Sequence, residues 1–497
     1  MNNALPIFIV IPLLGAALLI FTPRFRLLRH IIFIGVPLLS LLFSVLVLIE
    51  AQQEILVSNI GGWPASASIS FIADPFSALM LTATSMLILF SNIFATISKD
   101  SNERYFAPLV LILSAGVYGA LLTADLFNLF VFIELMFLPS CGLVVMRKGL
   151  QRIGAARLYV NINLLTSSIF VVGVGFIYAS TGTVNLAGLA NAAANSEVVA
   201  VATGICLIAL SVKAGLVPVH GWISRTYPAT SPVVAALFSG LHTKVAVYAF
   251  YRIYSVMFGG DSKLLYFLTI AFAVSMVVGA LAALGETSIR SVLSFHMVSQ
   301  IGYIMLGVAL FGKLGLTAGI FYLIHHMIVK ASMFFSTAAI EETYGSGYFK
   351  DISNLLKREP LIAIAFFAGA MSLSGIPPFS GFVAKFSLLT AAVDKNNVLA
   401  ICAIILASII TLMAELRIWS KAFWPRQSSK DTLTTTNSAD MVATAQKTAS
   451  IPIVLPSLLL ASMSLFIGIN ADFLFELSSN AADSLINIEG YVQAVMQ

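Results

Sequence analysis

The sequence predicts an all-α, polytopic membrane protein with about fourteen transmembrane helices. The chain has 497 residues, of which 59% are hydrophobic and only 10% charged, and its mean hydropathy is +0.97. These values lie far outside the composition of soluble domains. Apolar runs of roughly 20 residues, long enough to cross a hydrocarbon core of about 30 Å as helices, recur along almost the whole chain.

The expected spans follow one another with short polar breaks. The first begins at Ala4 with no basic residue before it and no small-residue cleavage site after it, so a removable signal peptide is not expected. The predicted spans are 4–21, 30–50, 75–97, 106–123, 126–146, 157–180, 198–220, 231–254, 264–284, 291–311, 314–340, 360–391, 398–424 and 451–470.

The basic residues predict the topology, because Lys and Arg in loops stay on the cytoplasmic side. With the N-terminus outside, eighteen of the 27 Lys and Arg fall in inner segments. We therefore expect a multi-pass protein with both termini outside. The net charge of +5 is then mostly this asymmetry, and it does not indicate nucleic-acid binding. The outer segments hold only Arg252, Lys263, Lys313 and Lys395.

Two hydrophobic segments are broken by glycine and proline. The seventh contains KAGLVPVH at Lys213–His220, and the twelfth contains SGIPPFSG at Ser374–Gly381, followed by Lys385. Such breaks in corresponding places of two halves are typical of inverted repeats with a site at the break. Because the segments lie five spans apart, an odd number, the second unit must enter the membrane from the opposite side. The match is loose, since Lys213 precedes its proline and Lys385 follows its pair.

The chain therefore divides into two inverted five-helix repeats with flanking segments. The linker is rich in Ser, Thr and Ala, and the tail has apolar residues at helical spacing but too few to span, which predicts a surface or partner-contacting helix. The expected parts are helices 1–3 in 1–105, the first repeat (helices 4–8) in 106–254, the second repeat (helices 9–13) in 264–424, a cytoplasmic linker at 425–450, helix 14 at 451–470 and an amphipathic tail at 471–497.

Ionisable residues deep in spans mark the candidate site, because each costs at least about 2.5–3.5 kcal/mol to insert. Glu134 lies near the middle of its span with no residue in the same helix to neutralise it. Lys213, beside a helix break, is the natural partner, since unwound backbone offers polar groups and room for water. A purely structural Glu134–Lys213 ion pair is the alternative.

Two further lysines extend this site. Lys244 shares a helix face with Tyr248 and follows His242 closely. The alternative is that its long side chain snorkels, placing the ammonium at the membrane surface. Lys385 comes directly after the double proline. Its alternative role is a charge in helix packing.

The run FYLIHHMIVKASMFF places His326 and Lys330 four residues apart, hence on one helix face. A histidine and a lysine so spaced can pass a proton through one water. His325 lies about 100° around the helix and fits a satisfied buried polar residue as well as a proton carrier. Together with the other deep charges, these residues form a line across the protein.

Lysine suits proton transfer because burial lowers its pKa toward physiological pH, whereas a nearby carboxylate raises it again. Separating the pair therefore expels a proton. At about 7 Å and an effective dielectric constant near 20, one such pair is worth roughly 2.4 kcal/mol, and moving one charge through 100 mV costs about 2.3 kcal/mol. The free energy of separating one ion pair and the free energy of moving one charge through the membrane voltage are comparable, so the two processes can be coupled.

Other polar residues do not indicate a cofactor or an enzyme. Cys141, Cys206 and Cys402 form no C-x-x-C pair, and His220 and His296 lack a second ligand cluster. No nucleotide-binding or nucleophile motif occurs. Asp125, Arg252, Arg417 and Lys421 fall near span ends, where interfacial placement is the default, and Glu415 lies deeper and could pair with Arg417 or with another helix.

Three motifs resemble the antiporter-like subunits shared by Mrp cation/proton antiporters and respiratory complex I. They are FIELMFLPS around Glu134, the stretch from Lys213 through PVHGWISRTYPATSPVVAALFSGLHTK to Lys244, and HHMIVKASMFF. The likeness covers about residues 70–420, and the length, Lys385 and the tail are similar to the D-type family of Mrp antiporter subunits. The resemblance implies a fourteen-helix fold and a proton relay at Glu134, Lys213, Lys244, His326, Lys330 and Lys385.

The resemblance also implies partners and a location. They are the other Mrp subunits (A, B, C, E, F and G) in the lipid of a bacterial cell membrane, and the transported ion here is the proton, with Na⁺ a second candidate. A proton-pumping subunit of a complex I-like or hydrogenase complex is the alternative, because only some complex I relatives have glutamate in place of Lys385. A stand-alone symporter for an organic solute is disfavoured by the apolar lining and the line of lysines.

Overall fold

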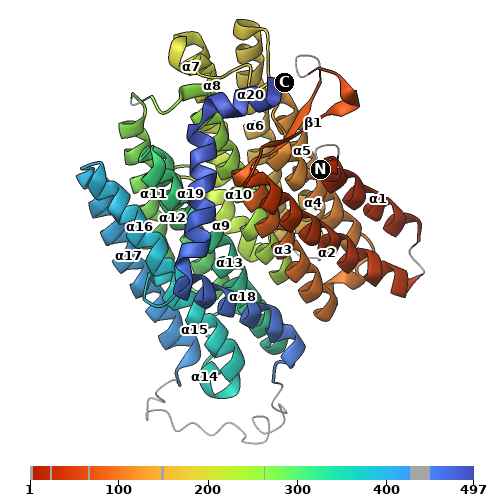
Figure 1. Ribbon diagram of the computed structural model, residues 1–497. Helices are drawn as coiled ribbons and strands as arrows, with labels where there is room; N and C mark the ends of the chain where they lie inside the picture. The colour runs from red at the N-terminus through yellow and green to blue at the C-terminus, as the bar shows by residue number, and fades with distance from the viewer. Residues whose placement is uncertain are drawn as a thin grey trace, which may run out of the picture.

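The protein is a bundle of long helices, seen here in a computed structural model that describes residues 4–22, 25–64, 68–146, 150–261, 263–425 and 448–496. Figure 1 shows most helices running along one common direction, with the first two at one side and helices from residues 380–418 at the other. The predicted linker 425–450 lies almost wholly outside the described residues.

The helices match the predicted spans closely. The main helices are α1 (Ile7–Phe21), α2 (Arg26–Ala51), α3 (Pro75–Ile97), α4 (Phe106–Leu122), α5 (Leu126–Val145), α6 (Leu150–Thr181), α8 (Glu197–Ala214), α10 (Pro232–Phe258), α11 (Leu265–Gly285), α12 (Ile289–Ala309), α13 (Lys313–Tyr344), α15 (Pro360–Ser374), α16 (Ser380–Asp394), α17 (Val398–Ile418), α18 (Ile451–Ile469) and α19 (Ala471–Ile486). Short helices are α7 (Ala192–Asn195), α9 (Gly221–Thr226), α14 (Leu355–Arg358) and α20 (Ile488–Met496).

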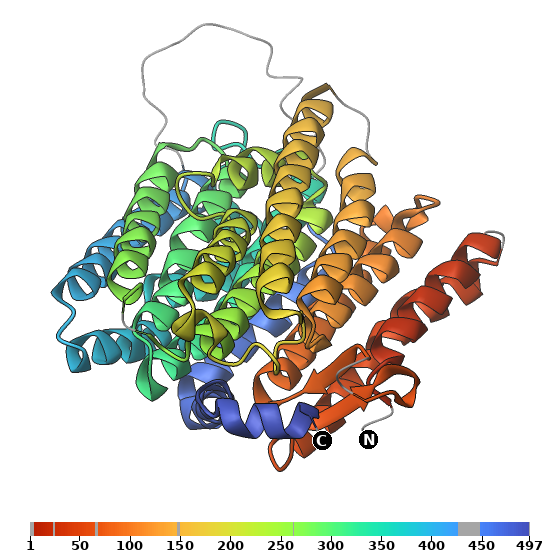
Figure 2. The same cartoon turned by 90° about the horizontal axis from the view of Figure 1, so that it is seen from above.

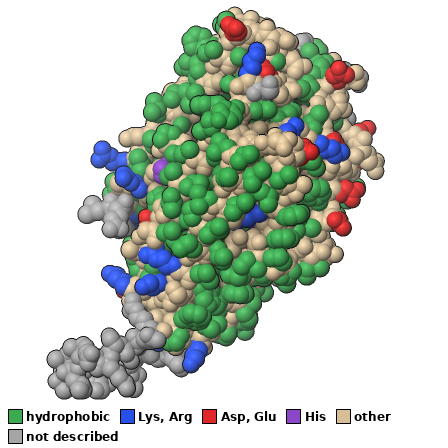
Figure 3. Space-filling view, turned by 90° about the vertical axis from the view of Figure 1, so that its left-hand side faces the viewer, with side chains coloured by type: hydrophobic (Ala, Val, Ile, Leu, Met, Phe, Trp, Pro, Cys, Tyr) green, Lys and Arg blue, Asp and Glu red, His purple; other side chains and the backbone are tan. Residues whose placement is uncertain are grey.

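Length and composition agree with a membrane protein. Within the described residues, eleven helices are long and apolar enough to span a membrane, and α1, α4 and α15 are shorter apolar helices of 15, 17 and 15 residues. Figure 3 shows hydrophobic side chains over the middle of one face, Lys and Arg gathered at its lower left, and most Asp and Glu at its top and right. The count of fourteen crossings, the repeats and the orientation of the termini stay predictions.

The long loop expected at 51–74 contains a small hairpin. Strands β1 (Leu56–Asn59) and β2 (Ser70–Ala73) pair antiparallel, with Leu56 opposite Ala73. The second strand leads directly into α3, whose first turn is closed by a capping box between Asp74 and Ser77.

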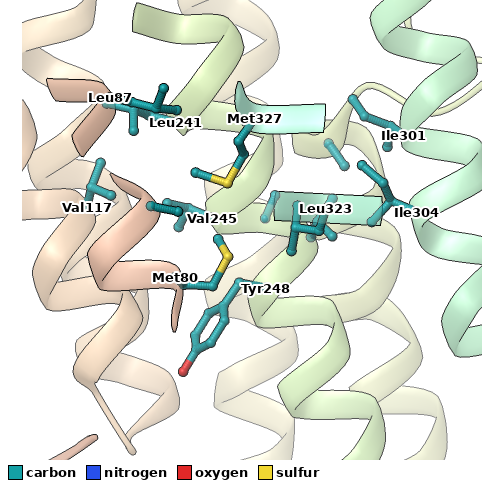
Figure 4. Close-up of a cluster of buried hydrophobic side chains, with 14 of the residues drawn as sticks. Met80, Leu87, Val117, Leu241, Val245, Tyr248, Ile301, Ile304, Leu323 and Met327 are labelled. Atoms are coloured by element: carbon teal, nitrogen blue, oxygen red, sulfur yellow. The ribbon is translucent and has the colours of Figure 1, made fainter. Parts of the chain in front are cut away.

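The centre of the bundle is formed by α10 and α13, and every residue of α10 is buried. Figure 4 shows Val245 and Tyr248 of α10 beside Met80 of α3, with Leu323 and Met327 of α13 on the other side. Both central helices are apolar all round, as expected for helices surrounded by others. The lysines in the middle of these helices, Lys244 and Lys330, are therefore enclosed by protein.

The two predicted helix breaks have the same local backbone. Gly215 ends α8 and Gly375 ends α15, both in the left-handed region, with φ of 86° and 83°. In each case the glycine N–H and the next N–H bond back to carbonyls of the last turn, a cap that glycine adopts at little cost. Helices α9 and α16 then begin six and five residues after their glycines.

The C-terminal segment runs along the bundle from one end to the other. The start of α18 lies beside the first turn of α15, where the Ala449 N–H donates to Glu359 Oε1 (2.9 Å). Near its other end, the Ser464 hydroxyl contacts Ser380 Oγ (2.9 Å) at the α15–α16 break, in the interior. Helix α19 then continues to the far end of the bundle, where Asp483 pairs with Lys313 (2.7 Å).

Only the last helix lies across the end of the molecule. Viewed from above, α19 is seen along its axis and α20 runs sideways from it (Figure 2). One face of α19 is buried, through Leu474, Ser478, Ala481, Ala482 and Leu485. The apolar face of α19 packs against this same chain, and the contact of the tail with a partner subunit stays a prediction.

Candidate functional site

The first group of buried charges surrounds the break after α8. Lys213 lies in the last turn of α8, is only 7% exposed, and its ammonium donates to Asn163 Oδ1 of α6 (3.4 Å). A small cavity of about 10 Å³ adjoins it, lined in part by Asn163, Lys213, Trp222 and His242. That volume is close to the space that one water molecule needs.

Glu134 lies on α5, half-buried, and does not form an ion pair with Lys213 within the described part of the chain. The two side chains therefore make no direct contact in this structure. The Glu134 carboxylate still acts on the Lys213 ammonium electrostatically. The small cavity adjoins Lys213 and not Glu134.

A series of hydrogen-bonded side chains that the sequence did not indicate ends at His242, which lines the same cavity as Lys213. The Ser140 hydroxyl lies 2.7 Å from the Tyr159 hydroxyl, which lies 3.4 Å from His242 Nδ1. All three side chains are buried. Ser140 and Tyr159 had no signal in the sequence beyond being polar residues within apolar spans.

The centre of the site joins α10 to α13. Lys244 is 1% exposed and donates to Thr243 Oγ1 (3.0 Å). His326 and Lys330 are fully buried on one face of α13, and neither ring nitrogen of His326 nor the Lys330 ammonium has a hydrogen-bond partner among the described residues. The three groups act on one another electrostatically. Buried polar atoms nearly always have a partner, which can be a protein group or an ordered water.

The second group of charges surrounds the break between α15 and α16. Lys385 reaches back across the break and donates to the carbonyl of Ser374, the last residue of α15 (3.2 Å). Its ammonium also lies 5.2 Å from the centre of the Tyr303 ring. Lys213 and Lys385 therefore both lie at a helix break, although one precedes its proline and the other follows it.

His325 contacts the same break from α13. Its Nδ1 lies 2.7 Å from Oγ of Ser380, the first residue of α16. The Ser380 hydroxyl in turn contacts Ser464 Oγ of α18 (2.9 Å). One ring nitrogen of His325 is thus satisfied by a hydroxyl, which agrees with a buried polar residue and equally with a proton carrier.

Glu415 is a central member of the site whose pairing the sequence left open. It is 1% exposed on α17, and its Oε1 lies 2.9 Å from His296 Nδ1 of α12, with both side chains fully enclosed. The carboxylate also acts electrostatically on Lys330 and Lys385. Arg417 instead donates to the Leu284 carbonyl. Glu415 thus supplies the second half with an acidic group, as Glu134 does for the first.

Arg252 corrects another prediction. It was expected at an outer interface, but it is 4% exposed and its guanidinium bonds to Asp74 Oδ1 (2.7 Å). The other oxygen of Asp74 accepts from the Ser484 hydroxyl of α19 (3.1 Å), and the Tyr491 ring lies 5.3 Å from the guanidinium. The C-terminal helices cover this pair and so remove it from the surface.

Two helix breaks joined by a line of enclosed lysines, histidines and glutamates define an ion-translocating membrane protein. A family model described as NADH:quinone oxidoreductase/Mrp antiporter, TM matches residues 123–411, more than half of the chain. The chain belongs to this family. It is 33% identical over 504 residues, 100% of both chains, to the D-type subunit of the Na(+)/H(+) antiporter of Alkalihalophilus pseudofirmus.

Two solved structures share the whole fold. A chain of the Mrp complex from Dietzia sp. superimposes with a TM-score of 0.95 at 43% identity, covering 100% of this chain and 99% of that one. A chain of the membrane-bound sulfane sulfur reductase, an archaeal respiratory membrane complex, superimposes with a TM-score of 0.90 at 25% identity, covering 99% and 100%.

Proposed function

We propose that this chain is the D-type, proton-translocating subunit of a multi-subunit Na⁺/H⁺ antiporter in a bacterial cell membrane, assembled with the other Mrp subunits. The observation that carries the proposal is a series of charges that starts at the half-buried Glu134 on α5 and continues through buried lysines to Lys385 on α16. One helix break lies beside Lys213 and the other beside Lys385. Full-length likeness to a D-type antiporter subunit and to an Mrp complex chain supports it. The likeness to a respiratory complex is weaker in identity.

The proton steps follow from the geometry of the first break. Lys213 holds a proton while the Glu134 carboxylate faces it, and releases it when the carboxylate moves away, because an enclosed ammonium without a counter-charge is costly. A water in the adjoining cavity can take the proton toward His242, which also lines that cavity. We assign the transfer to Lys244, His326 and Lys330 in the centre, and then to Lys385. His325 is an additional candidate.

Glu415 has the corresponding role in the second half. Its carboxylate can favour the charged form of either Lys330 or Lys385, so a shift of its position moves the proton between them. We assign only the proton to this chain and the sodium path to other subunits. Assembly is therefore required for exchange.

The test is the substitution Lys213→Arg. If the pair were only structural, arginine would hold the carboxylate at least as well as lysine, because its guanidinium can bind both oxygens. If the lysine must release its proton, arginine cannot replace it, since its pKa stays above about 12. We expect Lys213→Arg, Lys213→Ala and Glu134→Ala each to abolish exchange while the complex still assembles.

The measurement is dissipation of a pH gradient in everted vesicles on addition of sodium, with co-purification of the partner subunits as the assembly check. Lys263→Arg is the matched control, because this lysine is highly exposed, and it should exchange normally. Near-normal exchange in assembled Lys213→Arg would leave the pair a structural role only.

A further inference from the structure

A polar cavity lies beside the first turn of α2, well away from the buried charges. It has a volume of about 340 Å³ and is lined by Arg26, Arg29, His30 and Phe33 of α2, and by Ser101, Asn102 and Ala107 near the start of α4. The cavities beside α1 are lined mainly by apolar side chains. A space of this size lined by basic groups can hold a small anionic group.

Arg29 is held in place by the walls of this cavity. One of its terminal nitrogens donates to the carbonyls of Ser101 (2.8 Å), Glu103 (2.5 Å) and Arg104 (3.2 Å). Carbonyl groups fix the guanidinium without cancelling its charge. The positive charge is therefore positioned in advance, and its remaining N–H groups stay available to an anion.

Arg26 adds a second positive charge to the cavity. Its side chain is exposed, and the His30 ring lies beside it with Nδ1 donating to the Arg26 carbonyl (2.7 Å). Among the described residues no carboxylate forms an ion pair with Arg26 or Arg29. Glu103 lies in the turn before α4 and contacts Arg29 through its backbone carbonyl. The cavity thus carries at least two uncompensated charges.

The surface next to these residues is apolar. Leu27, Leu28 and Ile31 follow Arg26 closely along α2, and all three are exposed. Helix α2 is one of the eleven described helices that are long and apolar enough to span a membrane. The basic cavity therefore lies where the polar end of the helix meets its lipid-facing surface, which is the depth of phospholipid headgroups.

We propose that this cavity binds the phosphate group of an anionic phospholipid, whose acyl chain lies on the exposed face of α2. Arginine side chains match phosphate oxygens in geometry and keep their charge at every relevant pH. Inorganic phosphate offers the same oxygens, but only a lipid also covers Leu27 and Ile31. The proposal does not depend on the proton relay, which lies elsewhere in the chain.

The experiment uses the assembled complex, extracted in mild detergent and incubated with phosphatidylglycerol that carries a diazirine in its acyl chain. We expect light-induced crosslinks in the peptide around Leu27–Ile31, competed by unlabelled phosphatidylglycerol but not by phosphatidylcholine. The double variant Arg26→Gln/His30→Gln should reduce crosslinking about five-fold at low salt. Arg29 is kept, because it also supports the turn before α4.

The matched control is Lys357→Gln/Arg358→Gln, which removes the same number of basic side chains from α14, and it should crosslink like the parent protein. Equal crosslinking by the Arg26/His30 variant would overturn the proposal. Complete displacement of the labelled lipid by millimolar inorganic phosphate or by phosphatidylcholine would also overturn it. The absence of any crosslink at α2, as expected if a partner subunit covers this helix, would overturn it as well.

Discussion

Removing the charge of Asp74 tests whether the C-terminal tail stabilises the bundle through the buried pair with Arg252. We choose Asp74→Asn, because asparagine keeps an oxygen for the Ser77 N–H at the start of α3 (2.9 Å in the parent protein). Arg252→Met keeps the apolar stem of the arginine and removes its charge. The pair is joined at 2.7 Å and almost fully enclosed.

The magnitude follows from the burial of both partners. Breaking a buried ion pair by removing one partner costs about 3–5 kcal/mol, because the other charge is left uncompensated. Each single variant should lose about that much free energy of unfolding. The double variant removes both charges of the pair, so it should lose much less than the sum, with a coupling energy of about 2–3 kcal/mol.

The assay is unfolding of the solubilised complex in mixed micelles of increasing dodecyl sulfate content, with protease sensitivity of the tail as a local readout. All four members of the cycle are measured under the same conditions. Effects that add to within about 0.5 kcal/mol would refute the reasoning and make the pair energetically unimportant.

The same pair predicts a pH dependence. Burial raises the pKa of Asp74, but the Arg252 guanidinium and the Ser77 N–H and hydroxyl together hold the pKa below its ordinary value of 3.8. A carboxyl whose folded pKa is depressed stabilises the protein above the unfolded pKa, and this contribution disappears as pH falls through the folded value. The parent protein should therefore keep this stabilisation from neutral pH down to about pH 4.

Two further substitutions test the second half of the site. Glu415→Gln removes the acidic group that acts on Lys330 and Lys385 while keeping its shape, so exchange should fall at least about tenfold with assembly intact; unchanged exchange would remove Glu415 from the relay. Gly468→Ala should destabilise the chain by about 1–3 kcal/mol, because a Cβ there meets the Pro378 carbonyl and the Ser380 nitrogen at the break. Its control is Gly204→Ala, where nothing lies within 4 Å, and equal loss in both would contradict the close contact.

Some partners in the site could not be read from sequence because they lie far apart in the chain. Asp74 and Arg252 are separated by 178 residues, and nothing in either local sequence pairs them. Arg252 lies at a helix end, where placement in the headgroup region is the usual outcome. Only the return of α19 and α20 over this helix end encloses it.

Glu134 and Lys213 are a pair that the sequence suggested and that makes no contact in the structure. The free-energy cost of placing a charge in an apolar span singles out both residues, since such a charge needs compensation. They do not determine which polar atom each side chain touches. Packing of α6 against α8 brings Asn163 to Lys213 and leaves Glu134 at a distance.

The sequence by itself determined where the helices run, where two of them break and which charged residues lie within apolar helices. These features depend on local properties, namely the length of apolar runs, the conformations of glycine and proline, and the cost of burying a charge. Tertiary structure alone decided that His296 meets Glu415, that Asp74 meets Arg252 and that the tail packs into the bundle. Contacts between helices depend on how whole apolar faces pack together, and hydropathy, which is similar on all these faces, does not distinguish one partner from another.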